Sequence, residues 1–387
     1  MSGVVTRRLG DVAEIQMGTA PPGSSYNDEG VGLPLVAGAG DYGDLHPEPD
    51  RWTTEASRVT QPGEIIICVR ATVGDLNLAD RRLCLGRGVG GVRPKSEFLS
   101  DRFAWNVLKA KKSVLEDLAT GAVFPAIRRA HLEDLELPLP PLDEQRRIAD
   151  TLDTADGIRR RHLQARDEAK ALLSALSARE FTRLEEDASV PKVRLGDVAE
   201  IVSGSTPKTT VAEYWGGGIP WITPKDLSTQ QSPSIASGAK SISQAGLKSC
   251  STRLIPEGSV LFSSRAPIGL VAVARNALCT NQGFKSLVPR GDAHSGFLYH
   301  TLRHDRPKLE ALGSGATFKE LSKARFSDFL IPLPPLDEQR RIADMLDAAD
   351  SLARRHQAAA DDAAALLASL SHNIFTRLEQ EACRESA

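Results

Sequence analysis

The sequence predicts an α+β protein in which one plan, a mixed α/β segment followed by a long helix, is used twice. Two nearly identical stretches lie 194 residues apart, and each follows a proline-rich turn and carries an apolar stripe with helical spacing. The preceding stretches hold short β-branched runs after Pro/Gly turns, such as residues 64–69 and 259–262, which is typical of strands. A chain of 387 residues also exceeds what one hydrophobic core usually serves.

The repeat defines the organisation of the chain. Residues 137–156 read LPLPPLDEQRRIADTLDTAD, and residues 331–350 read IPLPPLDEQRRIADMLDAAD. The alignment continues without a gap to residues 185 and 379, and 28 of the 43 positions from 143 and 337 onward are identical. The octapeptide RLGDVAEI also occurs twice, at 8–15 and 194–201. We therefore expect variable segments at 1–142 and 188–336, constant helices at 143–187 and 337–380, and a tail at 381–387.

The constant segments predict long helices. Pro138, Pro140 and Pro141 cannot lie inside a helix, so they mark its beginning, and Asp143 is the expected N-cap. Apolar or small residues then recur at spacings of three and four, which predicts a seam that packs against another helix. We assign helix pairing and partner docking to Ile148, Leu152, Ile158, Leu172 and Leu176 in the first helix and to Ile342, Leu346, Leu352, Leu366 and Leu370 in the second. His162 and His356 fall on the same seams.

The simplest partner for each helix is the other copy. The alternative is that each helix packs only on its own mixed segment. About 40 residues make a rod of roughly 60 Å at the helical rise, more than one small domain needs to cover, so the length favours pairing.

The variable segments differ in detail from the helices and from each other. Residues 103–118 and 297–312 are expected to form amphipathic helices, and residues 215–220 (WGGGIP) a loop.

The charge is distributed unevenly along the chain. The net charge of -2 shows that the chain as a whole is not a polycation, but residues 190–336 carry 17 basic and 10 acidic groups. Residues 70–95 of the first segment hold a smaller basic cluster. These clusters favour contact with a polyanion; the alternative is an ordinary solvated surface.

Several classes of protein are excluded by composition. No apolar run reaches the length of a membrane span, the first residues lack a signal-peptide core, and the five cysteines form no CxxC pair. These features indicate a protein of the reducing cytoplasm without a disulfide scaffold.

Sequence motifs of enzymes are also missing or incomplete. The GxGxxG match at 38–43 is followed by two prolines instead of the helix that a dinucleotide site needs. No P-loop motif occurs, and His300 and His304 lack the glutamate of the HExxH motif. We expect no catalytic residue, no metal site and no cofactor.

The duplicated PLPPLDEQRRIAD, the two RLGDVAEI openings and the variable–constant–variable–constant plan resemble the specificity subunit of type I restriction-modification systems. The resemblance covers essentially the whole chain. It implies that the variable segments are target recognition domains and that the constant helices form an antiparallel coiled coil. It also implies a double-stranded DNA partner with a split asymmetric site, two docked adenine-methyltransferase subunits, and an ATP-dependent restriction subunit that can join. A fused enzyme, a protein-only coiled-coil scaffold and a module of another phage-defence system are the rival hypotheses.

Candidate DNA contacts follow from the resemblance and from side-chain chemistry, since arginine suits guanine and asparagine or glutamine suits adenine. In the second domain they are Lys225, Arg265, Asn281, Gln282 and Lys285, and in the first Arg70, Arg82 and Arg87. The alternative role for Arg70 and Arg265 is a structural hydrogen bond to loop carbonyls. The first domain has Gly86-Arg87-Gly88 where the second has Asn281-Gln282-Gly283, which fits different half-sites.

Overall fold

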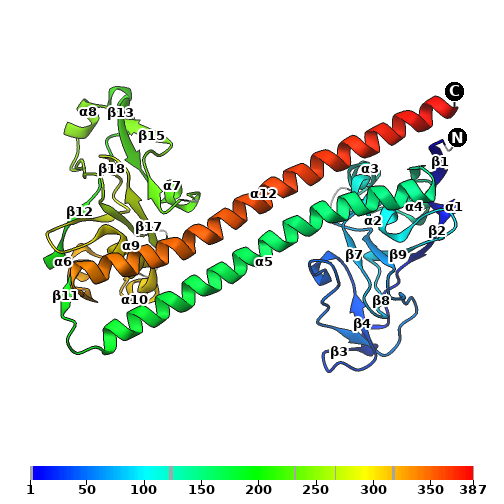
Figure 1. Cartoon of the computed structure of the whole chain (residues 1–387), viewed down its shortest axis with the longest axis horizontal. Coiled ribbons are helices and arrows are strands. Elements are labelled where there is room, and N and C mark those ends of the chain that lie inside the picture. Colours follow the sequence, from blue (N-terminus) through cyan, green and yellow to red (C-terminus); the bar gives the residue numbers. More distant parts are fainter. Residues whose placement is uncertain (1–2, 122–124, 231, 266, 316–318, 387) are drawn as a thin grey trace. The chain divides into compact units, whose positions relative to one another are not determined.

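The computed structural model describes residues 3–121, 125–230, 232–265, 267–315 and 319–386. The chain divides into two compact units, which we call unit 1 (residues 1–161 with 359–387) and unit 2 (residues 162–358). Each unit contains one variable segment and parts of both long helices (Figure 1). The predicted α+β architecture is confirmed.

Unit 1 is built on two small sheets. The first has the strand order β2-β9-β6-β7 and the second β3-β5-β4-β8, while β1 pairs antiparallel with β10, Val5 opposite Leu139. Helices α2 and α3 occupy the region where one amphipathic helix was predicted; they are separate because the backbone bends at Lys111. The elements are β1 Val5–Arg8, α1 Leu9–Val12, β2 Ala13–Met17, β3 Tyr26–Asn27, β4 Leu33–Val36, β5 Trp52–Thr53, β6 Ile65–Cys68, β7 Leu76–Leu78, β8 Cys84–Leu85, β9 Val89–Pro94, α2 Asp101–Ala110, α3 Lys112–Asp117, α4 Arg129–Glu133 and β10 Glu136–Leu139.

Unit 2 repeats this plan with five strands in its first sheet and three in its second, where unit 1 has four in each. Its main sheet has the order β12-β19-β16-β17-β14, its smaller sheet β15-β13-β18, and β11 pairs antiparallel with β20. The elements are β11 Lys192–Arg194, α6 Leu195–Val198, β12 Ala199–Ser203, β13 Trp215–Ile222, α7 Pro224–Ser228, β14 Ser234–Ile235, β15 Lys240–Ile242, α8 Gln244–Lys248, β16 Val260–Ser264, β17 Ile268–Ala274, β18 Cys279–Thr280, β19 Lys285–Pro289, α9 Ser295–His304, α10 Arg306–Ala311, α11 Lys323–Ser327 and β20 Leu330–Pro332.

Two sequence-based predictions for unit 2 are wrong in detail. Residues 215–220 belong to strand β13 instead of a loop: Trp215 and Ile219 both pair with Ile242, and the glycines between them form a bulge. Gly216 and Gly218 adopt positive φ angles there, a conformation that glycine adopts without strain. Residues 297–312 form α9 and α10 instead of one helix.

The two long helices are α5, Leu142–Glu186, and α12, Leu336–Ser386. The beginning of α5 lies with the end of α12 in unit 1, and the end of α5 lies with the beginning of α12 in unit 2, so the helices run antiparallel. In unit 2, Nδ1 of His162 and Nδ1 of His356 are 3.1 Å apart, so one ring donates a hydrogen bond to its counterpart. The predicted helix pairing is confirmed.

The ends of these helices differ from the prediction. Helix α5 begins one residue before Asp143, and the first helical hydrogen bond is accepted by the carbonyl of Pro141. Asp143 is therefore not the N-cap; it lies in the first turn and pairs with Arg146 at 2.9 Å. Helix α12 continues through residues 381–386, the expected tail, because Ala382 is buried in the core of unit 1.

The seam also differs from the predicted list. Ile148, Leu152, Ile342 and Leu346 are buried, and Leu176 and Leu370 pack partly buried against the cores. By contrast, Ile158, Leu172, Leu352 and Leu366 are 36% to 64% exposed, so these four side chains are not buried between the helices. The physical reason is the size of their neighbours: Ala169, Ala353 and Ala360 are buried instead, and small side chains allow the axes to approach too closely for leucine between them.

Candidate nucleic-acid interface

A buried glutamine at the start of each long helix is hydrogen-bonded to the variable segment of its unit. In unit 1, Gln145 Nε2 donates to the carbonyls of Phe98 and Pro140, both at 2.9 Å, and its Oε1 accepts from Ser100 N at 3.0 Å. Gln339 makes the corresponding bonds in unit 2 with Asp292, Pro334 and His294. These glutamines were missed as functional positions, although their presence in both copies of DEQRR was the available signal.

The far end of the opposite long helix completes the same attachment. In unit 1, the ring of Phe375 from α12 lies 5.8 Å from Phe103 of α2. In unit 2, Phe181 from α5 lies 5.8 Å from Phe297 of α9. The same 194-residue shift relates the two pairs, so each variable segment is held by the start of one long helix and the end of the other.

Four of the predicted DNA contacts in unit 2 gather where β16 ends. Ser264 N donates to the carbonyl of Gly283 at 2.7 Å, which places Arg265 beside the turn 281–283. Asn281 Oδ1 accepts from Gly283 N at 2.9 Å, and Asn281 N donates to the carbonyl of Ile222 at 3.0 Å. The exposed Gln282 bonds through its side chain to Thr206, and the exposed Lys225 lies in the neighbouring helix α7.

Arg265 and Lys285 share a carboxylate that the sequence analysis did not single out. Glu320 pairs through its backbone with Arg265, and its Oε2 lies 3.6 Å from the guanidinium. Its Oε1 lies 3.5 Å from Nζ of Lys285, whose side chain is only 9% exposed. Burial lowers the pKa of Lys285, although the charge of Glu320 opposes that shift.

The candidate residues of unit 1 occupy a similar frame. Val69 N donates to the carbonyl of Gly88 at 2.9 Å, which places the exposed Arg70 and Arg87 on neighbouring segments. Arg70 pairs through its backbone with Ala126, the counterpart of Glu320. Arg82 is exposed before β8, and among the described residues no hydrogen bond or ion pair joins it to Arg70 or Arg87.

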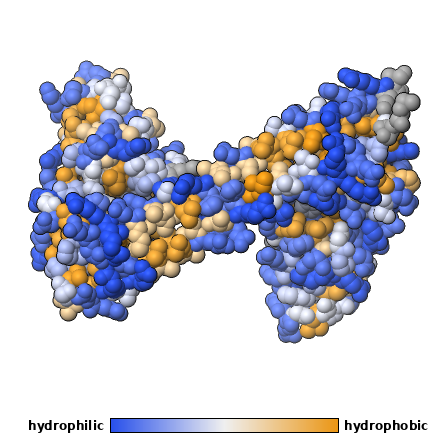
Figure 2. Space-filling view, viewed as in Figure 1, coloured by the Kyte–Doolittle hydropathy of each residue, from blue (hydrophilic) through white to orange (hydrophobic). Residues whose placement is uncertain are grey.

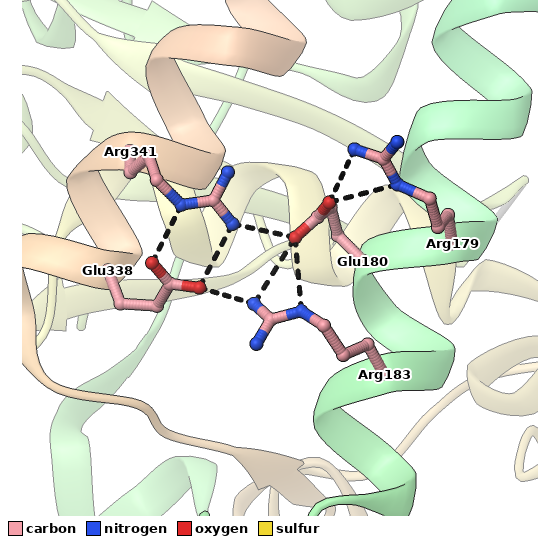
Figure 3. Close-up of polar contacts among 5 residues, drawn as sticks. All are labelled: Arg179, Glu180, Arg183, Glu338 and Arg341. Atoms are coloured by element: carbon pink, nitrogen blue, oxygen red, sulfur yellow. Dashed lines mark hydrogen bonds and ion pairs between the residues drawn. The ribbon is translucent and has the colours of Figure 1, made fainter.

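An ion network joins the helix pair of unit 2 (Figure 3). Glu180 of α5, 3% exposed, pairs with Arg179 at 2.7 Å, with Arg183 at 3.2 Å and with Arg341 of α12 at 2.7 Å. Glu338 of α12 also pairs with Arg183 and Arg341. Burial alone would raise the pKa of Glu180, but the arginine hydrogen bonds outweigh it and hold that pKa below its usual value.

Comparison with known proteins decides the family. The model of the family described as "Type I restriction modification DNA specificity domain" matches residues 1–166 and 189–359. The chain belongs to this family. Its fold is that of an S subunit of a type I restriction-modification system from M. genitalium, with a TM-score of 0.66 and 17% identity over 97% of this chain and 96% of that one. A chain from a study of type I R-M complex assembly gives a TM-score of 0.63 at 23% identity, covering 96% and 97%.

Curated relatives match part of this specificity-family chain. The MjaIX specificity subunit of Methanocaldococcus jannaschii is 41% identical over 172 residues, 44% of this chain and 39% of the relative. The EcoR124I/EcoR124II specificity subunit of Escherichia coli is 30% identical over 166 residues, 41% of this chain and 40% of the relative. The matches thus span about two fifths of these relatives. Within the described part of the chain, no helix is long and apolar enough to cross a membrane.

Proposed function

We propose that this chain is the sequence-reading subunit of a type I restriction-modification complex and that each unit reads one half of a split, asymmetric DNA site. One observation carries the proposal: the two units present different side chains on the same hydrogen-bonded frame. The bonds Val69–Gly88 and Ser264–Gly283 align Arg70 with Arg265 and Arg87 with Gln282. A shared frame with different exposed side chains is what two readers of unlike half-sites require.

The chemistry of these side chains supports base and phosphate contact. Arginine donates two parallel hydrogen bonds to guanine O6 and N7, and glutamine recognises adenine in the same way. Lysine and arginine contacts to phosphate supply affinity and set the register without reading sequence. The exposed Arg70, Arg87, Lys225 and Gln282 are available for both roles.

The long helices supply docking surfaces for two methyltransferase subunits in this proposal. Ile158 and Leu366 are exposed in unit 1, and their counterparts Leu352 and Leu172 are exposed in unit 2. Figure 2 shows hydrophobic side chains reaching the surface along these helices. Each unit therefore has one pair of exposed apolar side chains that no described residue covers. Two such surfaces, one per unit, fit two copies of one partner. In this proposal an ATP-dependent restriction subunit joins the same complex, and catalysis belongs to the partner subunits.

The experiment is methylome sequencing of a host with and without this chain, together with gel shifts of the purified chain on random duplexes. We expect adenine methylation at one split motif that disappears without the chain, and binding that weakens steeply with salt. Replacing residues 1–142 by another recognition domain should change one half of the motif only. Methyl transfer by the purified chain alone would support a fused enzyme, and absence of salt-dependent DNA binding would support a protein-only scaffold.

A further inference from the structure

We propose that Glu320 is a specificity-determining residue of the second recognition domain, which suppresses non-specific DNA binding by neutralising Arg265 and Lys285 until a correct base is met. The inference rests on the proposed function, because it assumes that this surface contacts DNA. It goes beyond that function because it assigns a role to an acidic residue that lies between two basic candidate DNA contacts.

The geometry makes Glu320 a bridge between two cations. Its two carboxylate oxygens face different partners, Oε1 toward Lys285 at 3.5 Å and Oε2 toward Arg265 at 3.6 Å. The backbone holds this arrangement, because Glu320 pairs with both Arg265 and Ser314, and Leu321 N donates to the carbonyl of Ser264 at 2.9 Å. The carboxylate is therefore fixed by the fold at the end of β16.

The exposure of the three side chains decides which cation can leave. Arg265 is 35% exposed and Glu320 is 43% exposed, whereas Lys285 is 9% exposed. When Arg265 turns toward a guanine edge, Lys285 remains beside Glu320, so neither the carboxylate nor the buried ammonium loses its partner. A buried charge without a partner is costly, so the shared carboxylate lets Arg265 move at a lower cost.

The electrostatic consequence is discrimination between phosphate and base. Phosphate contact depends on net positive charge and is the main source of non-specific affinity. One carboxylate beside two cations lowers their net charge from +2 to +1, so an approaching phosphate is attracted more weakly than it would be without Glu320. A guanine edge offers Arg265 two aligned acceptors, which compensates for its departure from Glu320. Specificity thus increases because the affinity for phosphate falls while the contact with the correct base is retained.

Unit 1 provides an internal control for this reasoning. The backbone pairs Arg70–Ala126 and Thr120–Ala126 correspond to Arg265–Glu320 and Ser314–Glu320. Ala126 stands where unit 2 has Glu320, and Gly90 stands where it has Lys285. The same frame therefore exists with and without the carboxylate, and the two positions can be exchanged.

The test compares Glu320→Ala, Glu320→Gln and Ala126→Glu in the full chain. Binding to a random duplex and to the duplex identified by methylome sequencing is measured between about 50 and 200 mM salt, a range over which phosphate contacts lose much of their affinity. We expect both Glu320 variants to bind the random duplex about tenfold more tightly at low salt. Each newly contacted phosphate should steepen the slope of log K against log salt by about 0.9.

The remaining outcomes separate this inference from the proposed function. Glu320→Gln keeps the shape of the side chain, so it replaces Glu320→Ala if the latter unfolds. Ala126→Glu should weaken random-duplex binding and flatten the slope. Unchanged slopes and an unchanged ratio of specific to non-specific affinity in the Glu320 variants would overturn the inference alone. A wild-type chain that shows no salt-dependent duplex binding would overturn the proposed function with it.

Discussion

Unit 1 and unit 2 hold the same helix ends together by different physical means. In unit 2, Glu180 is buried among three arginines, whereas unit 1 has Ile374 and Asn373 where unit 2 has Glu180 and Arg179. Ile374 packs partly buried against the core of unit 1. The phenylalanine pairs beside these positions are the same in both units. The comparison teaches that apolar packing sets the common geometry, while the polar layer around it is free to diverge after duplication.

The largest expected effect tests the shared packing. Phe181→Ala and Phe375→Ala should each reduce the free energy of unfolding of their own unit by about 3–5 kcal/mol, because Phe181 is buried against α9 and Phe375 against α2. Urea unfolding followed by hydrogen exchange assigns each loss to a unit. If one substitution costs much less than the other, the two attachments are not equivalent.

A smaller effect tests the polar difference. Glu180→Ala should cost roughly 2–3 kcal/mol, below the cost of breaking a fully buried pair, because the arginines left behind are half-exposed and regain water. The double variant Arg179→Asn with Glu180→Ile reproduces the unit 1 residues and should unfold close to wild type. Thermal unfolding of both variants provides the measurement; a double variant as unstable as Glu180→Ala would show that unit 2 depends on the ion network.

The exposed apolar residues test whether the units dock partners equally. Leu172→Ser and Leu366→Ser should leave the stability of the chain nearly unchanged, since both side chains are exposed. Each should weaken one of the proposed methyltransferase contacts by about 1–2 kcal/mol, because a leucine that a partner covers in part gains less than the roughly 1.5–3 kcal/mol of full burial. Native mass spectrometry of complexes reconstituted at a series of methyltransferase concentrations measures the stoichiometry and the affinity. Two bound subunits with unchanged affinity in both variants would remove these residues from the docking surface.

The smallest expected effect is on the pH dependence of stability, which Glu180 gives to unit 2 and not to unit 1. The folded-state pKa of Glu180 lies below its ordinary value of 4.5, so its ionised form stabilises unit 2 fully above about pH 4.5. That stabilisation fades as the pH falls below this value. The double variant Arg179→Asn with Glu180→Ile should therefore lose less stability between pH 5 and 3 than wild type, about the window in which a lowered carboxyl pKa acts. Equal acid sensitivity of the two proteins would contradict a role for Glu180.

Much of the fold and part of the candidate site could be predicted from local patterns. The prolines before residues 142 and 336 locate the starts of the long helices within one residue, because proline lacks the N–H that a helix interior needs. The β-branched run at Ile65–Cys68 forms a buried strand as expected. The placement of Ile158 and Leu352 could not be predicted, since periodicity does not show that neighbouring alanines bring two axes close together.

The sequence by itself determined the duplication, the two long helices and the family to which the chain belongs, because these depend on residue order and helical period. Only the tertiary structure decided which polar groups meet: Glu320 with Arg265 and Lys285, Gln145 with the backbone of Phe98 and Ser100, and Glu180 with Arg341. These partners are separated by 20 or more residues along the chain. Such contacts form only when packed elements bring distant segments together. Local residue spacing therefore cannot predict that a carboxylate will pair with a cation from a distant part of the chain.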